Sequence, residues 1–184
     1  MSKEKTLGDV LRSQGVSRRG FLKFCAATAS MMALPPSMIP AIAEALEKAR
    51  RPSVIWLSFQ ECTGCTESLT RSHSPTVEGL IFDAISLDYH HTLQAASGHA
   101  AEAAREAAME ENFGNYIMVV DGSIPTDNPG YSTIAGISNL DMLMDTAKGA
   151  AAIVAIGSCA AFGGIPAARP NPTGARSVAE LITD

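Results

Sequence analysis

Three cysteines in this sequence have the spacing and setting of a metal-binding or redox site. Cys62 and Cys65 form a C-x-x-C pair within Glu61-Cys-Thr-Gly-Cys-Thr-Glu67, and Cys159 ends Gly157-Ser158-Cys159. The thiolate is the form of cysteine that binds metal ions and attacks disulfides. Because we expect a helix to begin at the C-x-x-C pair, its amides should lower the pKa of both thiols. The spacing alone leaves metal binding and disulfide exchange both open.

Apolar runs that alternate with helical patterns indicate which elements position these cysteines. We expect strands near residues 53–59, 85–89, 116–120 and 150–156, and helices near residues 66–71, 95–112, 139–148 and 177–182. Strands that alternate with helices predict an α/β fold, in which helices cover both faces of a parallel sheet. The unbroken apolar runs at 116–120 and 150–156 predict strands buried on both faces.

This predicted sheet would bring the three cysteines together. The carboxyl ends of parallel strands share one edge, and open sheets of this kind bind ligands there. Cys62 and Cys65 follow the first strand and Cys159 follows the fourth, while Asp121-Gly122 ends the third. Three thiols are an odd number for disulfide chemistry, whereas iron-sulfur clusters and structural zinc commonly take four ligands. The sequence therefore favours a metal centre that needs one further ligand.

Composition and charge exclude several classes of protein. The 184 residues are 46% hydrophobic and 18% charged, with a net charge of −5, which is typical of a globular domain. The acidic balance argues against a nucleic-acid partner, because phosphate binding needs a basic surface. No apolar run reaches the roughly 18 residues that a membrane-spanning helix needs. Four cysteines are also too few for a disulfide scaffold in a chain of this length.

The first 45 residues have the pattern of an export signal. The pair Arg18-Arg19 precedes an apolar stretch at 24–34 and a small-residue site, Ala41-Ile42-Ala43. Paired arginines indicate the twin-arginine route, which carries folded proteins. Cleavage after Ala43 or Ala45 would also remove Cys25. The alternative is an amphipathic helix with two incidental arginines, which does not explain the order of the three regions.

Four segments of the sequence resemble the small subunit of nickel-iron hydrogenases, in the order found in that family. They are Glu61–Glu67 after a V-I-W-L strand, Ser86-Leu-Asp-Tyr89, Gly157–Gly164 and Ala168–Thr173. The twin-arginine leader is similar to that of the family's exported, membrane-associated members. The resemblance covers essentially the whole chain.

The resemblance implies a twin-arginine signal peptide at 1–45 and a flavodoxin-like iron-sulfur domain at 46–184. In that domain Cys62, Cys65 and Cys159 match three of the four ligands of the proximal 4Fe-4S cluster. The fourth ligand, the further iron-sulfur clusters and a C-terminal membrane anchor would lie beyond residue 184, so the chain would be an N-terminal portion of the subunit.

The same resemblance implies a partner and a role. The hydrogenase large subunit would hold the nickel-iron centre that splits hydrogen, and this chain would conduct the electrons without a catalytic residue of its own. The electrons would pass to a downstream membrane carrier such as a cytochrome. The complex would be periplasmic and membrane-associated.

Several residues are expected to surround the cluster without binding it. They are Glu61, Thr63, Gly64, Gly122 and Gly164. Glu61 would shape the field at the cluster or help proton movement, or it would be an ordinary carboxylate near a helix start. Oxygen-tolerant family members carry extra cysteines that would fall at Gly64 and Gly164. Glycine at both positions implies the standard, oxygen-sensitive cluster and lets amides approach its sulfurs.

Two other functions remain open at this point. A thioredoxin-like oxidoreductase would use Cys62 and Cys65 alone, and gives the third thiol no task. A zinc-stabilised binding module would use all three thiols and would be colourless. The adjacent histidines His90 and His91 are expected to form a solvated turn, and we assign them no role.

Overall fold

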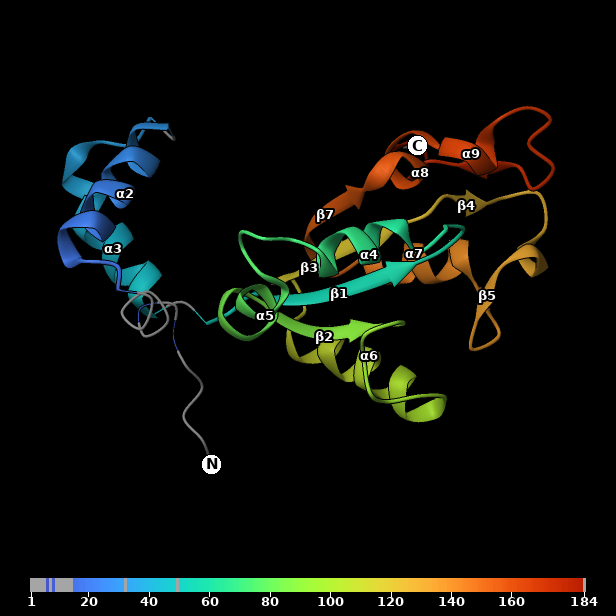
Figure 1. Ribbon diagram of the computed structural model, residues 1–184, viewed down its shortest axis with the longest axis horizontal. Coiled ribbons are helices and arrows are strands. Elements are labelled where there is room, and N and C mark those ends of the chain that lie inside the picture. Colours follow the sequence, from blue (N-terminus) through green and yellow to red (C-terminus); the bar gives the residue numbers. More distant parts are fainter. Residues whose placement is uncertain (1–5, 7, 9–14, 32, 49, 184) are drawn as a thin grey trace. The chain divides into compact units, whose positions relative to one another are not determined.

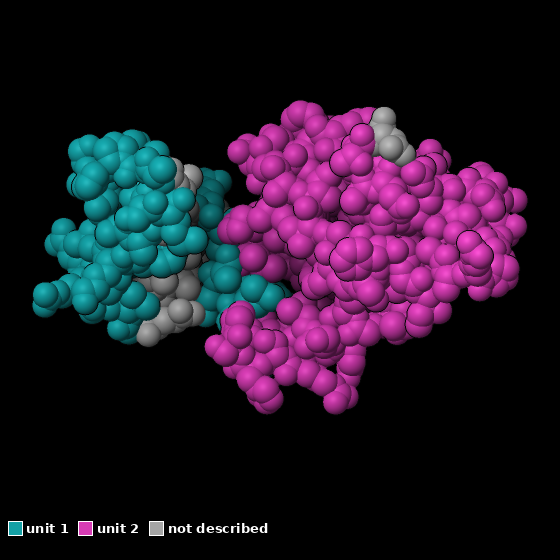
Figure 2. Space-filling view, turned by 90° about the horizontal axis from the view of Figure 1, so that it is seen from above, with its two compact units in different colours: residues 1–51, 78–84 teal, residues 52–77, 85–184 magenta. Residues whose placement is uncertain are grey.

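A computed structural model describes residues 6, 8, 15–31, 33–48 and 50–183 of the chain. The chain divides into two compact units, which Figure 2 shows in different colours. The first contains residues 1–51 and 78–84, and the second contains residues 52–77 and 85–184. Among the described residues, no helix combines the length and apolar character needed to cross a membrane.

The first unit consists of short helices around a small apolar core. These are α2 (Arg18–Met31), the 3-10 helix η1 (Pro36–Met38), α3 (Ile39–Lys48) and the π-helix η2 (Leu80–Ala84), with α5 (Val77–Gly79) leading into η2. The hydroxyl of Ser17 accepts a hydrogen bond from the Gly20 amide at 3.2 Å, as an N-cap does. Phe21, Cys25 and Ala43 form the core. Arg51 ties η2 to this unit by donating to the carbonyl of Phe82 at 2.8 Å.

The second unit is built on a four-stranded parallel sheet (Figure 1). Its strands are β1 (Ser53–Ser58), β2 (Ser86–His90), β3 (Tyr116–Asp121) and β7 (Ala150–Ile156), in the order β2-β1-β3-β7. This order is that of the first four strands of the flavodoxin-like arrangement. The predicted α/β fold with a parallel sheet is therefore confirmed.

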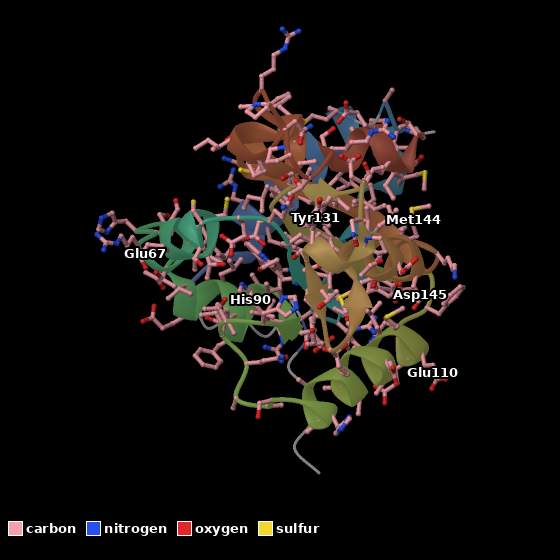
Figure 3. The ribbon with its side chains drawn as sticks, turned by 90° about the vertical axis from the view of Figure 1, so that its right-hand side faces the viewer. Glu67, His90, Glu110, Tyr131, Met144 and Asp145 are labelled. Carbon is pink, nitrogen blue, oxygen red and sulfur yellow. The ribbon has the colours of Figure 1, made fainter. Side chains whose placement is uncertain are left out.

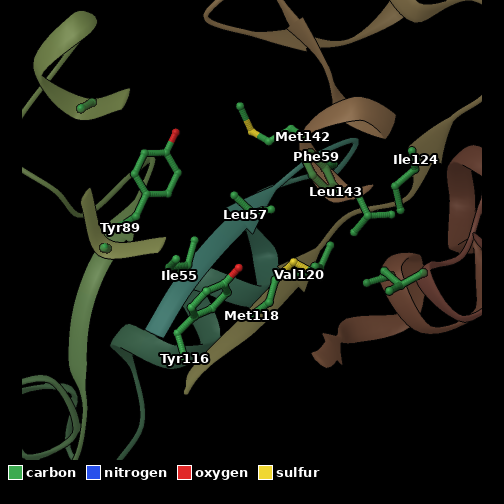
Figure 4. Packing of buried hydrophobic residues seen from close by; sticks show 14 residues of the cluster. Ile55, Leu57, Phe59, Tyr89, Tyr116, Met118, Val120, Ile124, Met142 and Leu143 are labelled. Atoms are coloured by element: carbon green, nitrogen blue, oxygen red, sulfur yellow. The ribbon is translucent and has the colours of Figure 1, made fainter. Parts of the chain in front are cut away.

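Helices cover both faces of this sheet. Because successive side chains of a strand point to opposite faces, Ile55 and Leu57 join one core cluster and Trp56 joins another. The first cluster, seen in Figure 4, packs against α6 (His99–Glu111) and α7 (Asn139–Ala147). The second cluster packs against Leu69 of α4 (Gly64–Thr70).

Strand β7 is more exposed than its apolar sequence predicts. Among the described strands it pairs only with β3, so it forms an edge of the sheet. Ile153 and Ala155 pack against the main core, whereas Val154 points to the other face and is 46% exposed. The prediction that residues 150–156 are buried on both faces is therefore wrong. Among the described residues, no element covers the face of β7 on which Val154 lies.

The remaining elements are short. They are β4 (Ile124–Pro125) paired with β8 (Ala175–Arg176), η3 (Pro129–Tyr131), β5 (Thr133–Ile134) paired with β6 (Ile137–Ser138), α8 (Gly157–Phe162), α9 (Gly164–Ala167) and α10 (Val178–Ile182). Ser138 caps α7, and Ser177 and Glu180 form a capping box at α10. These caps explain why the last two predicted helices agree closely with the structure. Helix α6 begins later than predicted, at His99.

Candidate metal centre at the carboxyl edge of the sheet

The chain that leads to the C-x-x-C pair is fixed to the end of β3. The Phe59 amide donates to the carbonyl of Asp121 at 2.9 Å, and Gln60 and Ser123 exchange two backbone hydrogen bonds of 3.1 and 3.0 Å. Gly122 lies between these contacts, where a Cβ atom would come within 2.8 Å of the Gln60 backbone. The predicted site residue Gly122 therefore holds the strand ends close together and lies against backbone.

Cys65 meets the end of β7, as expected from a parallel sheet. Its thiol lies 3.8 Å from the carbonyl oxygen of Ile156, which is 91 residues later in the chain. A Cβ atom at Gly157 would come within 2.4 Å of the Cys65 sulfur. Cys159 follows two residues further on, in the first turn of α8. The cysteine after the first strand and the segment after the fourth strand are thus brought to one edge.

Each of the three thiols lies beside a glycine. A Cβ atom would be 3.1 Å from the Cys62 sulfur at Gly64, and 2.7 Å from the Cys159 sulfur at Gly164. With Gly157 beside Cys65, all three sulfurs lie close to glycine backbone, where a larger residue would clash with the sulfur. All three cysteines are free thiols in the structure.

The charges at this edge are predominantly negative. Burial raises the pKa of the Cys65 thiol, and Asp121, Cys159, Cys62 and Glu61 raise it further. The expectation that a helix start lowers the pKa of this thiol is therefore wrong. Helix α4 is only seven residues long, and desolvation together with the neighbouring negative groups outweighs its amides. A bound cation would reverse this balance and stabilise the thiolates.

Glu61 and Thr63 lie on the loop between β1 and α4. The Thr63 hydroxyl donates to Oε1 of Glu61 at 3.3 Å, and Thr63 itself has a φ of 64° in the left-handed region. Oε2 of Glu61 is buried, with no hydrogen-bond partner among the described residues. Burial and the charge of Asp121 raise the pKa of Glu61. This carboxylate is therefore held in the same negative environment as Cys65.

His90 and His91 belong to a buried polar layer beside α4, the helix that contains Cys65. This layer was not predicted from the sequence. His90 is 1% exposed, and its ring lies 4.9 Å from the ring of Trp56, whose Nε1 donates to Oδ1 of Asp121 at 3.1 Å. Nδ1 of His91 accepts a hydrogen bond from the Ser58 amide at 3.2 Å. The prediction of a solvated turn is wrong for both histidines. Burial lowers the pKa of each imidazole, so both favour the neutral form.

Within the part of the chain that the structure describes, no three His, Cys, Asp or Glu side chains are placed to hold a single metal ion. Arg18 and Arg19 belong to the first unit, where they lie exposed in the first turn of α2. The geometry thus gives three thiols along one edge, each with a glycine close to its sulfur.

Known proteins are similar to this chain in both sequence and fold. The family model for NADH ubiquinone oxidoreductase, 20 Kd subunit, matches residues 62–183. The Hydrogenase-2 small chain of Escherichia coli K12 is 49% identical over 174 residues, which make up 94% of this chain and 47% of that protein. The periplasmic NiFe hydrogenase small subunit 1 of Nitratidesulfovibrio vulgaris Hildenborough is 48% identical over 173 residues, covering 94% of this chain and 54% of that protein.

The fold agrees with these matches. A crystal structure of the Ni-Fe-Se hydrogenase from Desulfomicrobium baculatum superposes with a TM-score of 0.71 at 36% identity, over 73% of this chain and 52% of that chain. The sheet is open and parallel with thiols at its carboxyl edge, the edge at which α/β proteins of this class bind their ligands. The chain belongs to the NADH ubiquinone oxidoreductase 20 Kd subunit family, and over 94% of its length it is similar to hydrogenase small subunits. It spans about half the length of the curated relatives it matches.

Proposed function

We propose that this chain is the electron-transfer small subunit of a nickel-iron hydrogenase. It would hold a proximal 4Fe-4S cluster at the carboxyl edge of its sheet and carry electrons to or from the nickel-iron centre of the large subunit, during reversible hydrogen oxidation. The observation that carries this proposal is the position of the Cys65 sulfur beside Gly157, two residues before Cys159. Hydrogen would be split in the partner subunit only.

The donor set fits such a cluster. Iron-sulfur clusters are held by cysteine thiolates, and the three thiols each adjoin a glycine. We assign Cys62, Cys65 and Cys159 as three ligands. Because such clusters commonly take four ligands, one further ligand would complete the set.

The chain's own residues would set the electrostatics of electron transfer. A bound cluster supplies a group that accepts and releases single electrons. The carboxylates of Glu61 and Asp121, which raise the pKa of Cys65, favour the oxidised state of such a group. Glycines at 64, 157 and 164 let backbone amides approach the sulfurs, which favours the reduced state. The reduction potential would reflect the balance between these two influences.

An apolar surface beside Cys159 supports the assignment of a partner subunit. Phe162 of α8 is 84% exposed and Ile165 of α9 is 88% exposed. Ile165 also lines a groove of about 470 Å³, together with Gln60, Pro166, Ala168, Arg169, Pro170, Pro172 and Thr173. Large apolar side chains exposed together mark protein interaction sites. We propose that the large subunit covers this surface, which would bring its metal centre close to the cluster.

We also propose that the protein is exported by the twin-arginine pathway. The paired Arg18 and Arg19 at the start of α2, followed by the apolar stretch at 24–34, support this, together with the small-residue site around Ala43. The complex would then lie in the periplasm in association with the membrane, and would pass electrons to a carrier such as a cytochrome. Replacing both arginines by lysine should keep the protein in the cytoplasm, as measured by cell fractionation. Unchanged export of that variant would overturn this proposal.

The cluster proposal is tested by metal analysis of the complex with its large subunit, purified without oxygen. We expect iron, acid-labile sulfide and a brown visible spectrum, and a loss of iron and of absorbance in Cys159→Ser. Cys25→Ala is the matched control, because Cys25 belongs to the first unit and should leave the iron content unchanged. A colourless protein that contains zinc, or an unchanged iron content in Cys159→Ser, would contradict the proposal.

A further inference from the structure

His90 is placed between the sheet and the helix that carries Cys65. It is the last residue of β2 and only 1% of it is exposed. Its Nδ1 accepts a hydrogen bond from the Thr92 amide at 3.2 Å. The proton of the neutral ring is therefore on Nε2, which lies 3.3 Å from the hydroxyl oxygen of Thr66 and donates to it. Because burial disfavours the imidazolium, this hydrogen bond has a fixed direction.

Thr66 is the residue of α4 that His90 contacts. It follows Cys65 directly in α4 and is 3% exposed. Helix α4 is seven residues long, and no side chain caps its start at Thr63. Besides Thr66, Leu69 packs on the second core cluster, and the Cys65 thiol lies 3.8 Å from the Ile156 carbonyl at the end of β7. The hydrogen bond from His90 therefore fixes the helix at the residue next to Cys65.

The His90 ring also packs against the sheet. Its ring lies against Trp56 of β1, with 4.9 Å between ring centroids and an interplanar angle of 32°. Trp56 in turn donates to Asp121 at the end of β3, and the charge of Asp121 acts on Cys65. Figure 3 shows His90 at the centre of this region, beneath the helix whose Glu67 points outward. His90 thus connects the ends of β2, β1 and β3 with α4.

We propose that His90 is a positioning residue for the metal centre: through its hydrogen bond to Thr66, it fixes the orientation of α4 and of Cys65, and so the reduction potential of the bound cluster. This inference rests on the proposed function. The potential of an iron-sulfur cluster depends on the hydrogen bonds to its sulfurs and on its exposure to solvent. Both change when the ligand-bearing helix can shift against the sheet.

Four variants separate this role from simple packing. His90→Gln keeps a neutral N–H donor of similar reach, and His90→Phe keeps a flat ring on Trp56 but has no donor. Thr66→Val removes the acceptor and preserves the shape of the side chain. Tyr89→Phe is the control, since Tyr89 lies next to His90 in β2 and is also 1% exposed. This substitution removes a hydrogen bond of 2.7 Å to Glu102, which belongs to α6 and not to α4.

The measurement is an anaerobic redox titration of the complex with its large subunit, monitored by the EPR signal of the cluster. We expect His90→Phe and Thr66→Val to shift the midpoint potential in the same direction. Combining these two substitutions should add little to either shift, because both remove the same interaction. His90→Gln and Tyr89→Phe should keep the potential of the unmodified protein.

The outcomes distinguish this inference from the proposed function. If the unmodified complex contains iron, and His90→Phe and Thr66→Val leave its potential unchanged, the inference is wrong and the proposed function stands. A shift in Tyr89→Phe as large as that in His90→Phe also overturns it, because loosening β2 alone would then suffice. An unmodified complex without iron refutes the proposed function, and this inference with it.

Discussion

Gly157 at the end of β7 lies directly against the sulfur of Cys65, which follows β1. A Cβ atom at residue 157 would come within 2.4 Å of that sulfur, and Gly157 has a φ of 77°. Only glycine meets both conditions without strain. This one contact joins the C-x-x-C segment to the segment that contains Cys159, and it determines whether the three thiols can share a ligand.

Replacing Gly157 by alanine should therefore impair metal binding. We expect Gly157→Ala to displace Cys65 and to lower the iron content of the complex, as measured by iron analysis and the visible spectrum. Gly114→Ala is the matched control, because Gly114 has a φ of 80° and open space where a Cβ atom would lie. Both variants carry a backbone cost of about 1–2 kcal/mol. Equal iron contents in the two variants would show that contact with Cys65 is unimportant.

Removing the exposed apolar side chains beside Cys159 should weaken assembly with the large subunit. Phe162→Ala and Ile165→Ala should each cost about 1–4 kcal/mol of binding free energy, because both side chains would be central to the interface. Binding of purified subunits, measured by titration, tests this. Phe113→Ala is the control, because Phe113 is 66% exposed and follows α6. If Phe162→Ala binds as tightly as Phe113→Ala, the large subunit does not cover this surface.

The ion pair between Arg105 and Glu102 should contribute to stability. The side chains are only 3% and 15% exposed, and Oε1 of Glu102 also accepts a hydrogen bond from Tyr89. Glu102→Gln leaves the buried guanidinium without its countercharge, so we expect a loss of about 3 kcal/mol and a lower Tm. Glu67→Gln breaks an exposed pair with Arg71, and should cost less than about 1 kcal/mol. Equal Tm values for the two variants would contradict this account.

His91 should make stability depend on pH. Burial is the main cause that lowers the pKa of its imidazole, while Glu102 and Asp121 oppose the shift and Arg105 adds to it. The unfolded imidazole gains a proton below about pH 6.5, whereas the folded one resists protonation. The contribution is therefore complete above that pH and is lost as the pH falls toward the folded pKa.

The variant His91→Asn isolates this effect. The asparagine oxygen can still accept the hydrogen bond from the Ser58 amide, but the side chain does not titrate. Thermal unfolding at pH 7.5 and pH 5.5 should show a larger decrease in Tm for the unmodified protein than for His91→Asn. Parallel decreases in the two proteins would mean that His91 binds protons equally in the folded and unfolded states, which would contradict the lowered pKa.

The sheet could be predicted from the sequence because each of its strands coincides with a short run of apolar residues. The runs at 53–59, 116–120 and 150–156 each form a strand, and parallel pairing then determines that Cys65 and Cys159 lie at the same edge. The exposure of Val154 could not be predicted, because it depends on whether another element covers the face beside β7. An apolar run has the same appearance in both cases.

The surroundings of the thiols were harder to predict, since they depend on tertiary contacts. The raised pKa of Cys65 results from burial and from Asp121, which is 56 positions away in the sequence. The burial of His90 depends on Trp56 and Thr66, which belong to other elements. One signal was present: His90 directly follows Tyr89 at the end of a strand, where side chains alternate between two covered faces.

The most direct test of the metal centre is anomalous X-ray diffraction at the iron absorption edge, from crystals of the complex grown without oxygen. We predict iron density within bonding distance of the sulfurs of Cys62, Cys65 and Cys159. Density for zinc alone, a disulfide between Cys62 and Cys65, or iron bonded to other residues would contradict the account.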